Sequence, residues 1–91
     1  MKTIYKYSMY DVVDVFSGTV ELEIPKEAKI LSIDSQHSKP CLWVLVDDGA
    51  EKETRRFRIV GTGQEIDFDY SKYVGTWLQD NGTFVWHLFE I

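Results

Sequence analysis

The chain has 91 residues, of which 44% are hydrophobic and 27% charged, and its net charge is −5. This length corresponds to one domain over residues 1–91, and the composition is too apolar for a disordered chain. Because the acidic net charge repels phosphate backbones, we expect no nucleic-acid partner.

The one cysteine, Cys41, lies in the most apolar run of the chain. It excludes an internal disulfide and indicates a small buried side chain in a reducing compartment. The chain does not open on a cationic segment followed by an apolar run. No apolar stretch approaches the ~20 residues of a membrane span. We therefore expect a cytoplasmic protein with no membrane partner.

The first predicted strand covers residues 3–9, which are rich in strand-forming side chains. Residues 10–18 have no regular period, and both a short helical turn and an irregular connection fit them. In either arrangement we expect Phe16 to pack into the core and Gly18 to end the segment.

Apolar and polar residues alternate strictly through residues 19–24, which predicts a strand buried on one face. Residues 28–35 predict the next strand. There we expect Leu31 and Ile33 on one face and Ile30 on the other.

The six residues 41–46 are all apolar and lie between turn-forming residues, which predicts a strand covered on both faces. Residues 54–60 predict another strand, with Phe57 and Ile59 pointing inward. We expect residues 29–60 to form a three-stranded antiparallel meander with residues 41–46 in its middle.

Asn81-Gly82 between two strand-like runs is the strongest short-range hairpin signal, because a type I′ turn needs positive φ at both positions. With these residues as the loop, one face pairs Leu78 with Val85, Thr76 with His87, and Val74 with Phe89. The other face pairs Gln79 with Phe84, Trp77 with Trp86, and Gly75 with Leu88. Both faces are apolar, so either the hairpin lies between two layers or one face is an interface.

These patterns predict an all-β fold, a small antiparallel sandwich or barrel of six or seven strands with a C-terminal β-hairpin. One face of the strand 41–46 meets the main core, and we expect the hairpin at 73–91 to cover the other. If the hairpin instead covers a second subunit, the outer face of that strand becomes the oligomer interface.

No set of catalytic or metal-binding residues is found in the sequence. Gly61-Thr62-Gly63 lacks the lysine and the following helix of a phosphate-binding loop. His37 and His87 are far apart and have no defined third ligand. Cys41 is a poor nucleophile in a buried strand, and no Gly-x-Ser-x-Gly elbow is present. We therefore expect no enzymatic activity, no catalytic residues, no cofactor and no metal.

Arg56 and Arg58 share one strand face and form the main concentration of positive charge. They could hold a phosphate or carboxylate, with Trp43 or Trp77 stacking on the ligand. The alternative is a solvated strand face paired with carboxylates such as Glu21. Trp77 and Trp86, predicted opposite each other, are more often core aromatics than a stacking platform.

Several segments carry a pattern that spans most of the chain: Ala28–Ser32, Cys41–Trp43, Val46-Asp47, Phe57–Gly63 with Ile66, Tyr73–Thr76 and Phe84–Glu90. This pattern resembles a family of short bacteriophage and prophage proteins that have no assigned activity. The resemblance covers residues 19–90, and the stretch 10–18 is longer than the family pattern. It implies a host-cell context, in which small acidic proteins often act by binding.

Three hypotheses follow. The first is a non-enzymatic phage-type binding protein that inhibits or redirects a host protein, including a defence protein. The second is a sponge that sequesters a small nucleotide signal with Arg56, Arg58 and an aromatic side chain such as Trp43 or Trp77. The third is a minor virion or assembly component.

Under the first hypothesis we expect a homodimer or larger oligomer in the host cytoplasm. The negative charge and the doubly apolar hairpin motivate this expectation. The interface would use one hairpin face, around Val74, Val85, His87, Phe89 and Ile91.

Overall fold

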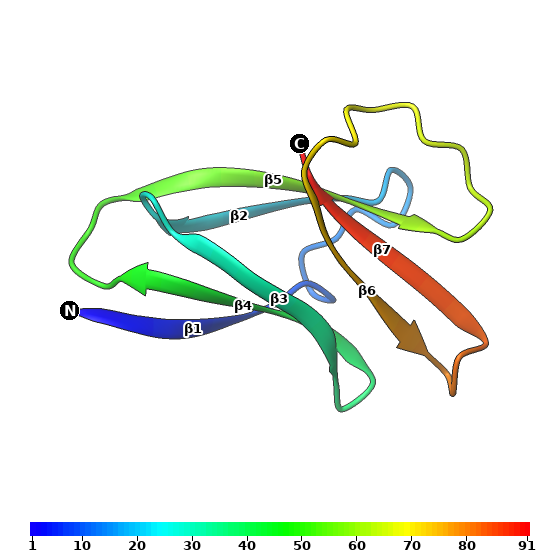
Figure 1. Cartoon of the computed structure of the whole chain (residues 1–91), viewed down its shortest axis with the longest axis horizontal. Coiled ribbons are helices and arrows are strands. Elements are labelled where there is room, and N and C mark those ends of the chain that lie inside the picture. The colour runs from blue at the N-terminus through cyan, green and yellow to red at the C-terminus, as the bar shows by residue number, and fades with distance from the viewer.

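The computed structural model describes residues 1–91 and consists of seven strands without a helix (Figure 1). The strands are β1 (Lys2–Ser8), β2 (Thr19–Pro25), β3 (Lys29–Gln36), β4 (Lys39–Asp47), β5 (Lys52–Gly61), β6 (Tyr73–Gln79) and β7 (Phe84–Glu90). They form a three-stranded sheet in the order β1-β4-β3 and a four-stranded sheet in the order β2-β5-β7-β6. This confirms the all-β fold with a C-terminal hairpin, and the two sheets do not close into a barrel.

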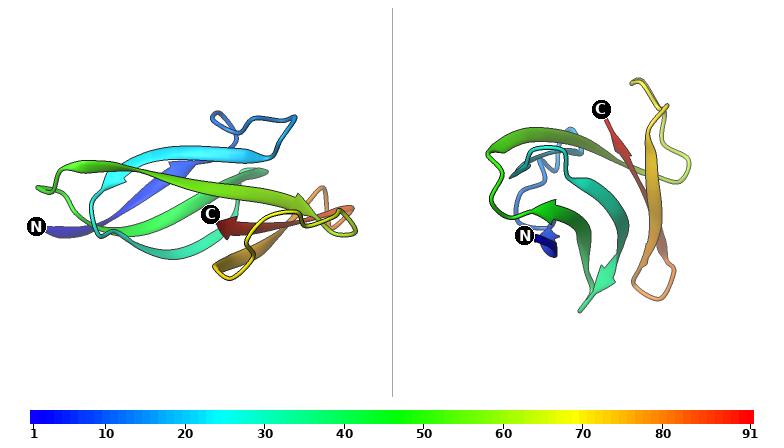
Figure 2. Two further views of the ribbon diagram at one scale, coloured as in Figure 1. Left: turned by 90° about the horizontal axis from the view of Figure 1, so that it is seen from above. Right: turned by 60° about the vertical axis from the view of Figure 1, so that its left-hand side comes forward.

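The two sheets are curved and face each other (Figure 2). Side chains from both sheets form one hydrophobic cluster between them. The alternating residues of β2 contribute to it as predicted, and the core face of β4 is Leu42, Val44 and Val46. Trp77 and Leu88 join the same cluster from the hairpin. The hairpin therefore lies against the inner face of the sandwich. The expectation that it covers the outer face of β4 is wrong.

The predicted meander over residues 29–60 is also wrong, because β4 and β5 belong to different sheets. β4 pairs with β1 and β3, whereas β5 pairs with β2 and β7. The edge of β4 that the meander assigned to β5 is taken by β1, from Lys2 opposite Asp47 to Ser8 opposite Cys41. Hydrophobic patterning marks strands but does not name their partners, so a strand distant in sequence can occupy that edge.

A β-bulge in β3 reverses the predicted arrangement of its apolar residues. The register shifts between Ile30, which lies opposite Val44, and Ser32, which lies opposite Trp43. The extra residue is Leu31, whose side chain is 43% exposed. Because one inserted residue changes the face of every residue on one side of it, Ile30 and Ile33 share the core face.

The hairpin register is confirmed at five of its six predicted pairs, from Gln79 opposite Phe84 to Gly75 opposite Leu88. Asn81 and Gly82 have φ values of 54° and 88°, as a type I′ turn requires. The sixth pair is wrong, since a bulge at Val74 places Tyr73 opposite Phe89.

The connection between β5 and β6, residues 62–72, packs on the outer side of the four-stranded sheet. The ring of Phe68 meets that of Phe89 edge-on at a centroid distance of 5.5 Å. The guanidinium of Arg58 lies 5.0 Å from the Phe68 ring and 3.3 Å from Asp67. This contact explains why the hairpin is apolar on both faces: one faces the core and the other meets this connection.

Arg55 and Glu90 form a mostly buried ion pair between β5 and β7, and both Nε and Nη2 of Arg55 donate to the carboxylate. Nη1 of Arg55 also donates to the carbonyl of Ala28 at 2.8 Å. The hydrogen bond to Glu90 raises the pKa of Arg55 above its ordinary value. The pair thus joins the end of the hairpin to the β2–β3 turn.

None of the elements is a helix of the length and hydropathy that membrane crossing requires.

Candidate binding site

The two arginines of the predicted ligand site are each paired with a carboxylate. Nε of Arg56 lies 3.5 Å from Glu21 on the exposed outer face of the four-stranded sheet. Arg58 lies beneath the 62–72 connection, between Asp67 and Phe68. Both arginines are thus paired with carboxylates, as in the alternative that the sequence offered, but only Arg56 is solvated.

The two tryptophans of the predicted site lie on different sheets. Trp43 is half-buried in β4, opposite Lys6 and Ser32. Trp77 is 4% exposed and belongs to the core side of β6. The structure therefore does not bring these tryptophans together with Arg56 and Arg58 in one site.

The predicted interface residues also divide among different environments. His87 lies between two hydroxyl groups, with Nε2 2.8 Å from Oγ1 of Thr62 and Nδ1 2.8 Å from Oγ1 of Thr76. Phe89 packs against Phe68 and Tyr73.

The other three predicted interface residues have different neighbours. Val74 lines the gap between β3 and β6. Val85 is half-buried opposite Leu78, and Ile91 is exposed at the end of the chain. Of the predicted hairpin face, Val85 with Leu78 and Ile91 thus remain accessible to a partner.

A more promising site lies where residues 10–18 pass beside the hairpin. It is a groove of about 370 Å³, and none of its twelve lining residues carries a charge. Its lining consists of Tyr10, Val13, Val15, Phe16, Ser17, Gly18, Pro40, Ile59, Gln64, Trp77, Gln79 and Trp86. We call it the tryptophan groove, after the cross-strand pair Trp77 and Trp86.

Two glutamines fix the polar part of the tryptophan groove. Nε1 of Trp86 donates to Oε1 of Gln79 at 2.7 Å, which orients the indole. Oε1 of Gln64 accepts the N–H of Gly61 at 2.7 Å, and its NH₂ group makes no hydrogen bond within the chain. The groove thus combines an aromatic wall with an available amide donor, a combination that suits a mainly apolar ligand with a carbonyl group.

The rim of the tryptophan groove exposes large apolar side chains. Phe16 is 98% exposed and Val15 80% exposed, and Tyr10 and Val12 are also exposed. The prediction that Phe16 packs into the core is therefore wrong. Val13, which packs against the core cluster, takes the inward position instead.

Local hydrogen bonds explain the outward direction of Phe16. Asp14 Oδ1 accepts the N–H of Phe16 at 3.0 Å, and the Asp14 carbonyl accepts the N–H of Gly18 at 2.7 Å. The Gly18 carbonyl then accepts the N–H of Ile59 at 2.7 Å, which fixes the turn on β5. Only glycine fits at position 18, where φ is 75° and a Cβ would lie 2.5 Å from the Ile59 oxygen.

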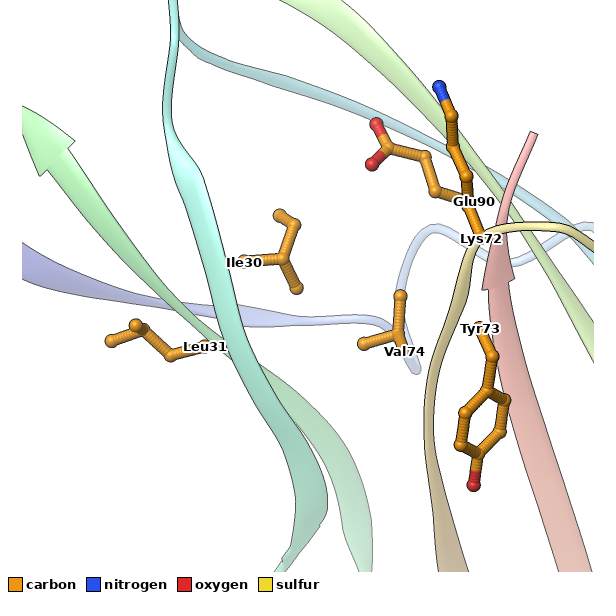
Figure 3. A pocket seen from close by; sticks show the side chains of 6 residues that line it. All are labelled: Ile30, Leu31, Lys72, Tyr73, Val74 and Glu90. Carbon is orange, nitrogen blue, oxygen red and sulfur yellow. The ribbon is translucent and has the colours of Figure 1, made fainter.

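A smaller hollow of about 230 Å³ lies at the seam between β3 and β6 (Figure 3). Ile30 and Leu31 line it from β3, and Tyr73 and Val74 from β6, so the two β-bulges meet there. The Glu90 carboxylate at its edge is already paired with Arg55. Of these two sites, the tryptophan groove is the larger and the uncharged one, which makes it the better ligand site.

Sequence reasoning missed most of the tryptophan groove. Its signal was present in the run Tyr10–Phe16, where apolar residues follow no strand or helix period. Such residues either pack irregularly or remain exposed, and the hydrophobic pattern does not distinguish the two. Trp86 lies opposite Trp77 as predicted, but the sequence favoured core aromatics over a stacking platform for this pair.

Comparison with known proteins gives a family but no activity. A family model described as "Domain of unknown function (DUF7352)" matches residues 1–91. No curated protein and no solved structure matches the chain.

Proposed function

The chain belongs to the DUF7352 domain family, and we propose that it is a non-enzymatic binding protein that captures an apolar segment of a protein partner in the tryptophan groove. The observation that carries this proposal is the uncharged groove together with the exposed side chains on its rim. Contiguous exposed apolar surface of this kind is typical of interaction sites.

Phe16 and Val15 support a protein partner over a small metabolite. Both side chains line the mouth of the groove and are at least 80% exposed, so a small ligand seated in the groove would contact them but leave much of their surface in water. A partner surface that extends beyond the groove would cover them. Burial of one such side chain contributes about 1.5–3 kcal/mol.

The resemblance to bacteriophage and prophage proteins gives the proposal its cellular context. In that context the partner is a host protein in the cytoplasm, and binding inhibits or redirects it. No three histidine, cysteine or acidic side chains lie close enough together to hold a metal ion. The proposal assigns the chain a binding role and no catalytic step.

Photo-crosslinking in cells tests the proposal. Phe16 is replaced by photoreactive benzoylphenylalanine, and the matched control carries the same group at Tyr70, which is 68% exposed. We expect one host protein to crosslink from position 16 and not from position 70. Equal crosslinking from both positions, or none from position 16, would contradict the proposal.

The nucleotide sponge and the virion component remain competing proposals. The sponge is tested by a thermal-shift screen with cyclic nucleotides and ADP-ribose derivatives, and absence of any stabilisation would remove it. Detection of the chain in purified phage particles would favour the virion component. The groove is preferred because Arg56 and Arg58 are already paired with carboxylates.

A further inference from the structure

Resting on the proposed function above, we infer that the partner segment is basic. It presents an apolar or aromatic side chain flanked by lysine or arginine. The apolar side chain enters the tryptophan groove, and the cations lie over an acidic rim.

The lining of the groove determines the anchor. Because all twelve lining residues are uncharged, a charged side chain buried there would find no opposite charge. Apolar and aromatic side chains have no charge to desolvate on entry and gain contact with Trp77 and Trp86. The volume of about 370 Å³ is at the small end of the range for ligand pockets. It suits one large side chain with its adjoining backbone.

Charged residues next to the lining residues determine which residues flank the anchor side chain in the partner segment. Four exposed acidic residues directly adjoin lining residues in the chain: Asp11, Asp14, Glu65 and Asp80. The cation on this rim is Lys39, whose Nζ lies 5.0 Å from the centroid of the Tyr10 ring. Arg58 also adjoins a lining residue, but it is paired with Asp67 beneath the 62–72 connection. The rim is therefore acidic around a neutral groove.

The same charges argue against a second copy as the occupant of the groove. Each chain carries a net charge of −5. Two copies that exchange Phe16 would bring two acidic rims together, and like charges across an interface oppose association. A basic segment gains attraction from the same rim.

Three capped pentapeptides test the inference with the intact chain: acetyl-Lys-Ala-Phe-Ala-Lys-amide and its versions with glutamate or serine in place of lysine. Binding is followed by the NMR signals of the indole N–H groups. We expect the basic peptide to shift the signals of Trp77 and Trp86 but not of Trp43, which lies on the other sheet. It should bind at least about fivefold more tightly than the acidic peptide at about 20 mM salt, and the preference should shrink at about 500 mM.

A charge-matched pair of variants locates the effect. The double variant Glu65→Gln and Asp80→Asn removes two charges from the rim. The control, Glu27→Gln with Glu51→Gln, removes one exposed charge from the β2–β3 turn and one from the β4–β5 turn. We expect the first variant to lose most of the preference for the basic peptide and the second to keep it.

Three results would overturn the inference. Equal binding of all three peptides would leave an apolar groove without charge selectivity, and the proposed function would stand. Indole shifts that grow with protein concentration alone would identify a second copy as the occupant. Absence of any binding would reject a basic apolar segment as the ligand. The proposed function is tested separately by the crosslinking experiment.

Discussion

The Cγ2 methyl group of Ile33 lies 2.7 Å from the position that a Cβ would occupy at Gly75. These residues belong to β3 and β6, the edge strands that bring the two sheets together. The close approach of the two sheets at this seam therefore requires the absence of a side chain at position 75.

We predict that Gly75→Ala lowers the free energy of unfolding by about 1–3 kcal/mol, because the new methyl group displaces a buried, branched side chain. Urea unfolding followed by tryptophan fluorescence measures the change. Gly49→Ala is the control, since its Cβ would meet only an Asp47 oxygen at 3.6 Å. If both variants have the same stability, the seam tolerates a side chain and the explanation fails.

Arg55 and Glu90 should be coupled in stability. We predict that Arg55→Leu and Glu90→Leu each lower the free energy of unfolding by about 2 kcal/mol, because the first leaves the mostly buried Glu90 carboxylate without its partner and the second leaves Arg55 with only the Glu53 carboxylate, at 3.9 Å. The double variant should lower the free energy of unfolding by less than the sum of the two single variants. A double-mutant cycle from urea unfolding measures this coupling, and strictly additive effects would contradict it.

The fold shows where sequence reasoning succeeds and where it stops. Asn81-Gly82 specified the hairpin register because turn geometry and strand pairing are local. The bulges at Leu31 and Val74 were not predicted, since an inserted residue has no local signature in these strands. Likewise, the pairing of β4 with β1 joins segments that are distant in the chain, and no local pattern specifies it.

The tryptophan groove illustrates the same limit for the site. Its position depends on the hydrogen bond from the N–H of Ile59 to the carbonyl of Gly18, which joins two segments far apart in the chain. That contact fixes the turn on β5, and the hydrogen bonds of Asp14 then direct Phe16 outward. The sequence shows apolar residues in the segment 10–18 but does not indicate whether their side chains point to the core or to solvent.

Asp69 should make the stability of the chain depend on pH. The N–H of Ser71 donates to Oδ1 of Asp69 at 2.9 Å, and this hydrogen bond lowers the pKa of Asp69 below its ordinary value. Because the pKa is lower in the folded than in the unfolded chain, the stabilisation is complete above the ordinary pKa of about 4 and is lost as pH falls through the lowered value.

We predict that Asp69→Asn removes this part of the pH dependence, since its amide oxygen can accept the hydrogen bond but does not titrate. Unfolding measured in steps from neutral pH to about pH 2.5 should show wild type losing more stability than the variant only below about pH 4. Parallel curves over the whole range would contradict the prediction.

The outer face of the hairpin remains the predicted self-association surface. Leu78 is 58% exposed opposite Val85, away from the tryptophan groove. We predict a light-scattering mass above that of a single chain at about 50 μM, and a decrease towards a single chain for Leu78→Glu. A wild-type monomer at that concentration would reject the oligomer.

The central claim is that the rim of the tryptophan groove carries partner binding. The most direct test is the Kd of the purified chain for the host protein that crosslinks from position 16, measured for wild type and for the double variant Val15→Ser and Phe16→Ser. Both side chains are at least 80% exposed, so the variant should keep the stability of the wild type. We predict that Kd rises at least about tenfold, while Tyr70→Ser leaves it unchanged. An unchanged Kd for the folded double variant would contradict the account.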